Sequence, residues 1–367
     1  MKKTVLITLY LSLMAFLVSM TWLETRKTRT AIEPTESDIE DTLIQPISTI
    51  DLKKNWGLSP QTVTEIKKAW DTVPCNQRIV VAVIDTGIDY SHPALRNSLW
   101  KNPEEIENNG IDDDGNGYVD DVFGWDFVDN DAIPQDDHGH GTHVSGIISA
   151  LTGSFQSCSK VSLMVIKYYD ANAAGQKNLE NTIKAFRYAV QNHAAIINYS
   201  GGGSEYSEIE HKIIAEAREK GILVVAAAGN EKQNTDIYGY YPASYDLSNI
   251  ISVAAITKTK KLVVSSNYGV ENVDVAAPGK NIYSTLPHHR YGYMTGTSQA
   301  AAYVTGLAAL TLALHPSFSI NKLKSLLIQN IIPIKSLSGK IKTSGIINAK
   351  QVLEIPALDA IETSSLK

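Results

Sequence analysis

Three short segments carry an aspartate, a histidine and a serine in contexts suited to catalysis. Asp85 ends a run of apolar residues, His140 lies in a segment rich in glycine and histidine, and Ser298 precedes a long alanine-rich run. A buried carboxylate can orient an imidazole, the imidazole can remove the serine proton, and the serine oxygen can then attack a carbonyl carbon. The three residue types together predict acyl-transfer chemistry.

Buried strands alternate with helices along the part of the chain that carries these residues. Continuous apolar runs, rich in β-branched residues, predict strands at 78–85, 161–166, 194–199, 222–228 and 250–256. Helical patterns lie between them at 180–192 and 208–220. This alternation predicts an α/β fold with a doubly wound, mainly parallel sheet and helices on both faces.

The ends of the predicted strands place small and polar residues at one edge of the sheet. Asp85-Thr86-Gly87 follows the first strand, Ser200 to Gly203 the third, and Gly229-Asn230 the fourth. Ligands of open parallel sheets bind beyond the carboxyl ends of the strands. Ser298 opens a predicted buried helix, where its backbone N–H is placed to meet a developing negative charge. We therefore expect one site at this edge.

These segments resemble the three signatures of the subtilisin-like serine proteases. They are Asp85-Thr86-Gly87, His140-Gly141-Thr142-His143 and Gly296-Thr297-Ser298, in the chain order of that family, with Ala-Ala-Gly-Asn ending at Asn230. The resemblance covers about residues 56–352. It implies that Asp85 orients His140, that His140 is general base and then general acid, and that Ser298 is the nucleophile. Asn230 Nδ2 and the Ser298 backbone N–H would hold the oxyanion.

The resemblance also implies how a polypeptide substrate is held. Ser200, Gly201 and Gly202 would pair with extended substrate backbone, and Ala227, Ala228 and Gly229 would form part of the wall beside the scissile bond. No cofactor is implied for catalysis. Gln299 follows the serine at a position where the family commonly has methionine. We therefore expect the chain to be active, and the glutamine could alter that activity.

Two other functions remain as alternatives to an exported serine endopeptidase. A catalytically weak or inactive protein of the same fold could bind peptides, although all three catalytic residues are present. An esterase would need a Gly-x-Ser-x-Gly turn, and the sequence around Ser298 is Gly-Thr-Ser-Gln-Ala.

An acidic segment, residues 100–131, lies between the aspartate and histidine signatures. We expect it to be an insertion relative to compact members of the family. Within it, oxygen-bearing residues alternate around a glycine as at the start of a calcium loop, namely Asp112, Asp114, Asn116, Gly117 and Asp120. The twelfth position is Phe123 rather than glutamate, so the segment is not an EF-hand. The hypotheses are a structural Ca²⁺ site or a solvated acidic turn.

The N-terminal 23 residues predict export. Lys2 and Lys3 precede an uncharged, mostly apolar run at 4–23, which fits either a cleaved signal peptide or a membrane anchor. Residues 24–52 are expected to be a polar linker without a folded pro-domain, residues 53–355 the peptidase domain, and residues 356–367 a disordered tail.

The net charge and the two cysteines indicate which partners and which cellular compartment to expect. The net charge is −6 and no basic block occurs, so no nucleic-acid groove is expected. We expect a monomer that contacts membrane only through its N-terminal segment. Cys75 and Cys158 precede two strands, 78–85 and 161–166, that the resemblance makes parallel neighbours. In an oxidising compartment they are predicted to form a disulfide, the alternative being two separate thiols.

Overall fold

The computed structural model describes residues 52–72, 78–152 and 161–354. The predicted export segment, nearly all of the linker, Cys75, Cys158 and the predicted tail lie outside the described residues.

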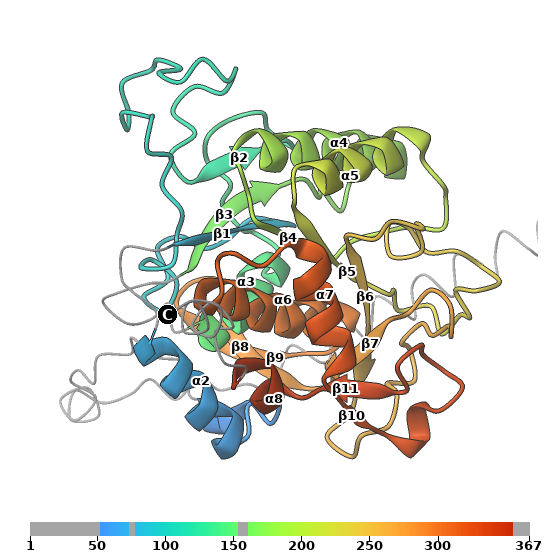
Figure 1. The fold of residues 1–367 in the computed structure, drawn as a ribbon. Helices are drawn as coiled ribbons and strands as arrows, with labels where there is room; N and C mark the ends of the chain where they lie inside the picture. Colours follow the sequence, from blue (N-terminus) through green and yellow to red (C-terminus); the bar gives the residue numbers. More distant parts are fainter. Residues whose placement is uncertain (1–51, 73–77, 153–160, 355–367) are drawn as a thin grey trace, which may run out of the picture. The chain divides into compact units, whose positions relative to one another are not determined.

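A mainly parallel sheet of nine strands forms the centre of the described fold (Figure 1). Its spatial order is β10-β11-β7-β6-β5-β4-β1-β3-β2, and the one antiparallel pair is β10 with β11. The strands are β1 (Ile79–Asp85), β2 (Gly124–Asp126), β3 (Val161–Lys167), β4 (Ile196–Tyr199), β5 (Leu223–Ala227), β6 (Ile250–Ile256), β7 (Val275–Pro278), β10 (Ile331–Pro333) and β11 (Gly345–Ile347). The predicted α/β class and parallel sheet are confirmed.

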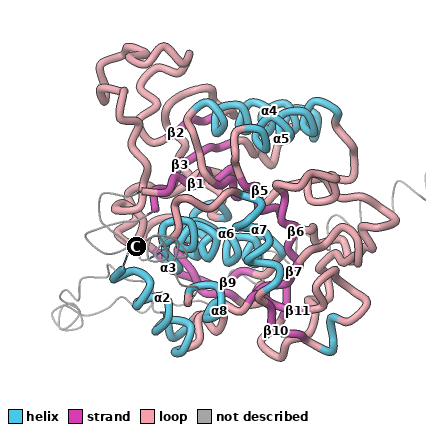
Figure 2. Tube along the Cα trace, in the orientation of Figure 1, coloured by secondary structure: helices cyan, strands magenta, loops and turns pink. Residues whose placement is uncertain are grey.

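Helices cover both faces of this sheet (Figures 1 and 2). On β1, Val81 and Val83 join one hydrophobic cluster, whereas Ala82 and Ile84 join the other, because successive side chains of a strand point to opposite faces. The first cluster includes residues of α2 (Pro60–Thr72), α3 (His140–Thr152), α6 (Thr297–Leu314), α7 (Ile320–Gln329) and α8 (Ala349–Leu353). The second includes residues of α4 (Gly175–Gln191) and α5 (Glu208–Glu219). The structure therefore has the predicted two-sided layering.

Helix α6 lies at the centre of the first cluster. Within the described part of the chain it is the one helix long and apolar enough to cross a membrane, with a mean hydropathy of 1.2. Because 89% of it is buried inside the fold, α6 is a core helix. Its alanines pack closely against the sheet and bring its first turn, with Ser298, to the carboxyl edge.

A short antiparallel hairpin holds α3 in place. It consists of β8 (Ile282–Leu286) and β9 (Arg290–Met294), which the sequence patterns did not predict. The His143 side chain bonds the carbonyl of Ile282 at 3.0 Å, and the Ser284 hydroxyl donates to the carbonyl of His143 at 2.8 Å. These bonds fix the helix whose first residue is His140.

Candidate active site

Asp85 and His140 form a direct hydrogen bond at the carboxyl end of β1. His140 Nδ1 lies 2.7 Å from Asp85 Oδ1, and the Asp85 residue is only 3% exposed. Burial opposes the charged imidazolium, but the charge and hydrogen bond of Asp85 outweigh it and raise the pKa of His140 above its usual 6.5. Asp85 therefore orients the ring and stabilises its protonated form, leaving Nε2 for proton transfer.

A second buried carboxylate, Asp136, holds the turn that carries His140. Its two oxygens accept five hydrogen bonds of 2.6–3.0 Å, from the backbone N–H groups of residues 138, 139 and 142 and from the hydroxyls of Thr86 and Thr142. Thr86 Oγ1 in turn accepts the backbone N–H of Gly141 at 2.9 Å. Asp136 thus ties the end of β1 to the start of α3, the two elements that carry the Asp85–His140 pair.

Ser298 is the second residue of α6 and lies at the same edge. Its hydroxyl donates to the backbone carbonyl of Ser200 at 3.2 Å, and the residue is 6% exposed. Before the proton can pass to His140, the O–H must turn away from the Ser200 carbonyl, and catalytic hydrogen bonds of this kind often form only when substrate is bound.

The loop after β5 places Asn230 beside the first turn of α6, which carries Ser298. Asn230 Oδ1 accepts the backbone N–H of Thr297 at 3.0 Å, and the Thr297 hydroxyl accepts the N–H of Gly229 at 3.2 Å. Because Oδ1 is held by α6, the amide Nδ2 of Asn230 remains as a donor for a developing oxyanion.

Asn267 clamps both sides of the Asn230 loop. Its Nδ2 donates to the carbonyl of Ala228 at 2.9 Å and to Glu231 Oε2 at 2.7 Å, and its Oδ1 accepts the N–H groups of Glu231 and Gln233. Gly229 has φ +99°, and a Cβ there would lie 2.3 Å from Asn267 Nδ2. The glycine is therefore needed for the clamp to close.

A cavity of about 260 Å³ lies over the catalytic pair. Its lining includes Asp85, His140 and the three predicted backbone-binding residues Ser200, Gly201 and Gly202. The N–H groups of Gly201 and Gly202 donate to no described residue. A Cβ on Gly201 would lie 2.0 Å from the Tyr168 hydroxyl, so position 201 can carry no side chain in this arrangement. The geometry suits an extended peptide that pairs with the segment.

The predicted wall residues lie deeper in the protein than the cavity over the Asp85–His140 pair. Ala227 and Ala228 pack in the hydrophobic core, and neither they nor Gly229 lines the cavity over the catalytic pair. They lead the chain into Asn230, and their contact with substrate stays a prediction.

Residues 76–353 match the Subtilase family, peptidase S8. The chain belongs to the subtilase family. Its sequence is 36% identical over 288 residues to subtilisin-like protease 1 of Plasmodium falciparum (isolate 3D7), covering 72% of this chain and 42% of that protein. It is 38% identical over 246 residues to a thermophilic serine proteinase of Bacillus sp. (strain AK1), covering 66% and 54%. The chain thus spans about half the length of these relatives.

Solved structures show the same fold as this subtilase. A cold-adapted subtilisin-like serine proteinase is 26% identical with a TM-score of 0.56, covering 72% of this chain and 88% of that one. A lanthipeptide protease has a TM-score of 0.66 at 22% identity, covering 83% and 95%, and supports the fold alone.

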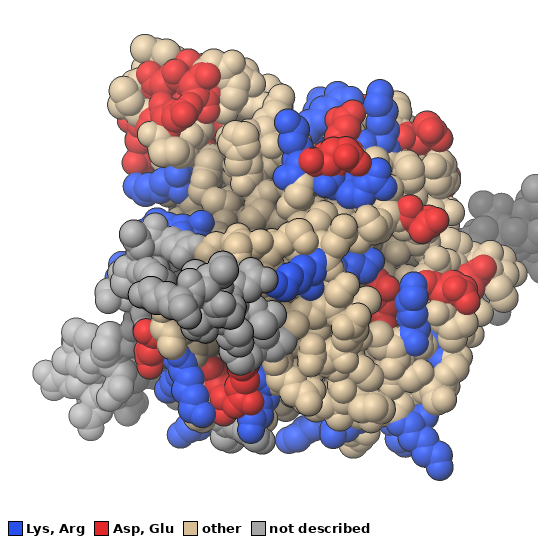
Figure 3. Space-filling view, viewed as in Figure 1, with Lys and Arg blue, Asp and Glu red and all other residues tan. Residues whose placement is uncertain are grey.

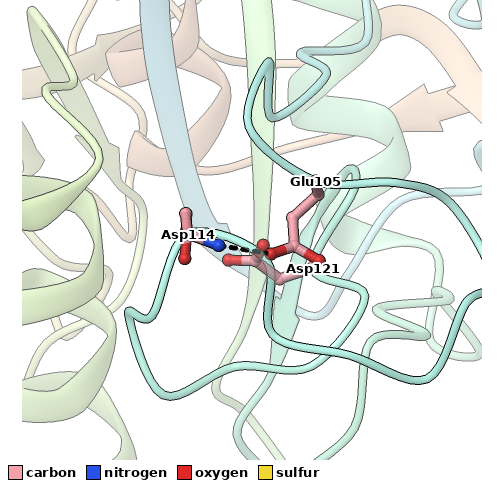
Figure 4. Close-up of side chains that lie close together, drawn as sticks. All are labelled: Glu105, Asp114 and Asp121. Atoms are coloured by element: carbon pink, nitrogen blue, oxygen red, sulfur yellow. Dashed lines mark hydrogen bonds between the residues drawn. The ribbon is translucent and has the colours of Figure 1, made fainter.

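The acidic segment gathers a different set of side chains from the one predicted. Figure 3 shows acidic side chains crowded on this part of the surface. Within it, carboxylate oxygens of Glu105, Asp114 and Asp121 lie within 4.8 Å of one another (Figure 4). Asp112 and Asp120 instead accept backbone N–H groups, of residues 116 and 117 and of residues 109 and 110 respectively.

Asparagines and a tyrosine surround this three-carboxylate cluster. Asn102 and Asn116 each donate to both Asp114 and Asp121, at 2.8–3.0 Å. Burial raises the pKa of Asp121 to about 6, although hydrogen bonds from Tyr188, Asn102 and Asn116 oppose the rise. Of the four predicted ligands, the structure brings Asp114 into the cluster and Asn116 to its edge.

Asp136 and Asn267 are the two functional positions that sequence reasoning missed. Both are fully buried polar residues that act through the backbone of a catalytic loop. Asp136 precedes His140 by four residues, and Asn267 lies in Ser-Ser-Asn-Tyr-Gly after β6. Neither segment has a spacing that reveals its hydrogen bonds.

Proposed function

We propose that this chain is an exported serine endopeptidase that hydrolyses polypeptides through an acyl-enzyme intermediate. The observation that carries the proposal is the 2.7 Å bond between His140 and Asp85 at the edge where Ser298 and Asn230 also lie. The subtilase family and the protease relatives support the same activity.

The reaction follows from the groups at this edge. An extended substrate pairs with Ser200–Gly202, His140 Nε2 takes the Ser298 proton, and Ser298 Oγ attacks the scissile carbonyl carbon. The oxyanion accepts hydrogen bonds from Asn230 Nδ2 and the Ser298 backbone N–H. His140 then gives the proton to the leaving amine, the C–N bond breaks, and water repeats the sequence on the ester.

A fluorophosphonate probe tests the nucleophile directly. The intact chain should be labelled and should cleave a peptide library, whereas Ser298→Ala should lose both properties, with turnover lower by several orders of magnitude. Full cleavage by Ser298→Ala would remove the assignment.

An inactive peptide-binding protein is the second candidate. The hydrogen bond from the Ser298 hydroxyl to Ser200, rather than to His140, is the observation that favours it. An unlabelled chain that still binds peptides and folds normally would support this alternative.

Export rests on the apolar run at residues 4–23. The catalytic domain is expected outside the cytoplasm, either released after cleavage or tethered by an uncleaved anchor. Fractionation of cells and N-terminal sequencing of the exported protein separate the two forms.

A structural Ca²⁺ bound by Glu105, Asp114 and Asp121 is part of the proposal. Three clustered carboxylates repel one another, Ca²⁺ prefers oxygen ligands, and Glu105 Oε2 is buried with no hydrogen-bond partner in the described structure. A chelator should lower the Tm of the wild type but not that of Glu105→Gln, while Asp112→Asn should keep the response. If the chelator does not change the Tm, the segment binds no structural Ca²⁺ and is a solvated acidic turn.

A disulfide between Cys75 and Cys158 also belongs to the proposal. Strands β1 and β3 are parallel neighbours with Ile79 opposite Val161, and each cysteine precedes one of these residues by a few positions. Closing a loop of about 80 residues stabilises the fold by roughly 4 kcal/mol in the chain-entropy account. Two reactive thiols in the denatured, unreduced protein would exclude the bridge.

A further inference from the structure

A second cavity opens beside the cavity of about 260 Å³ over the Asp85–His140 pair, which we call the groove. It has a volume of about 580 Å³ and shares Tyr168, Tyr169 and Gly202 with that groove. A peptide that lies along Ser200–Gly202 therefore passes the mouth of this cavity, and one of its side chains can enter. The volume is in the range of ligand pockets.

The lining of this second cavity is acidic and polar. It includes two carboxylates, Glu205 and Glu210, while no lysine, arginine or histidine of the described chain lines it. The remaining polar side chains are uncharged: Gln176, Asn178, Thr182, Ser204 and the tyrosines Tyr168, Tyr169, Tyr199 and Tyr241. The cavity thus favours a positively charged occupant.

Glu210 is the buried member of the pair of carboxylates. It is 3% exposed, although it lines the cavity. Its Oε2 lies 2.8 Å from the Tyr245 hydroxyl, and its Oε1 has no hydrogen bond to any described residue. The Tyr245 hydroxyl also lies 3.1 Å from the carbonyl of Ser207, so its single proton serves two acceptors. Among the described residues, the ionised carboxylate of Glu210 therefore has one side-chain donor, which it shares with the carbonyl of Ser207.

Burial also favours the protonated form of Glu210. Burial raises the pKa of Glu210 to about 7, against the lowering effect of the Tyr245 hydroxyl. A cationic side chain in the cavity would supply both charge and donors to the ionised form. Tyr199 and Tyr245 interact electrostatically with Glu210, Glu205 lines the same cavity, and the ring of His211 packs against Tyr245.

We propose that this cavity accepts a lysine or arginine side chain of the substrate, and that Glu210 is the residue that selects it. The inference rests on the proposed endopeptidase function and specifies its substrates as polypeptides with a basic residue at one fixed distance from the scissile bond.

A positional peptide library with the full chain at pH 8 tests this selection. At one substrate position, kcat/KM for lysine or arginine should exceed that for norleucine by roughly tenfold or more, as expected for a buried charge pair. Glu210→Gln has nearly the same shape and should abolish this preference while still cleaving norleucine peptides. Glu208→Gln, an equal charge change at an exposed position of the same helix, should keep the preference.

The outcomes distinguish the inference from the function on which it depends. A chain that reacts with fluorophosphonate but shows no basic preference at any position overturns the inference alone. A preference that survives in Glu210→Gln also overturns it. A chain that neither reacts nor cleaves overturns the proposed function together with the inference. Labelling of Glu210→Gln shows that the variant is folded.

Discussion

Replacing Glu210 by glutamine should change the pH dependence of stability in a defined direction. In the folded protein, burial raises the pKa of Glu210 from its ordinary value of 4.5 to about 7. The folded state then binds a proton more tightly than the unfolded state between these values. The contribution of Glu210 to the free energy of unfolding is therefore most favourable below pH 4.5, falls as the pH rises to about 7, and is constant above it.

The size of this effect follows from the pKa difference. At roughly 1.4 kcal/mol per pH unit, the wild type loses up to roughly 3 kcal/mol relative to Glu210→Gln between pH 4.5 and pH 8. The glutamine amide can donate to the Tyr245 hydroxyl, as the protonated acid would, so the variant should fold normally. Above pH 7 it should be the more stable protein.

Chemical denaturation at several pH values between 4.5 and 8 measures this difference. Both proteins should also carry Ser298→Ala, so that self-cleavage does not distort the transitions. Other groups with shifted pKa values, such as His140 and Asp121, are common to both proteins and cancel in the difference. A difference in unfolding free energy that does not vary with pH would refute the reasoning, and a constant difference for Glu208→Gln is the matching control.

Four further predictions concern the catalytic edge. Asn230→Ala should lower kcat by roughly a hundred- to a thousandfold, which is the range known for the oxyanion-hole asparagine of subtilisin. Asn267→Ala should also lower kcat, with little change in KM, because it releases the loop that holds Asn230. Activity should rise with pH through a pKa above 6.5 as His140 loses its proton, and in Asp85→Asn the residual activity should show this limb at lower pH. Gln299→Met should raise the free energy of unfolding by about 1–2 kcal/mol, measured by denaturation, because Gln299 Nε2 is buried without a partner among the described residues.

The sequence predicts the order of buried strands and the residues at their carboxyl ends because these signals are local. A continuous apolar run such as 78–85 can be a strand buried on both faces, and the residue that ends it must lie at the carboxyl edge. Strand β4 pairs with both β1 and β5, so the residues after these three strands meet as expected. The short β8 and β9 were missed because five residues of mixed burial have no distinctive period.

The acidic segment shows where linear spacing fails. Alternating oxygens at 112, 114 and 116 suggested that successive residues share one centre, but glycines at 110, 115 and 117 take positive φ values and turn the chain sharply. The carboxylate of Asp112 then accepts backbone N–H groups of its own turn, while Glu105 and Asp121, which lie on either side of these glycines in the sequence, come together. Such pairing depends on the closed loop rather than on neighbouring residues, so no periodic pattern predicts it.

The sequence around Glu210 shows that this glutamate occupies a position on the apolar face of its helix. Helix α5 buries Ile213, Ile214 and Ala217, and Glu210 lies three, four and seven residues before them, on the same face. An acid at a core position conflicts with the amphipathic pattern of its own helix, and such a conflict costs stability unless another requirement offsets it. Gln299 is a second case, since it is buried in the first turn of the apolar helix α6. One of these residues lines the cavity beside the groove and the other follows the nucleophile, so both departures from the core pattern occur beside the substrate path. We therefore expect Glu210 and Gln299 to lower the free energy of unfolding in exchange for a role in function, and the denaturation and peptide-library experiments test this for Glu210.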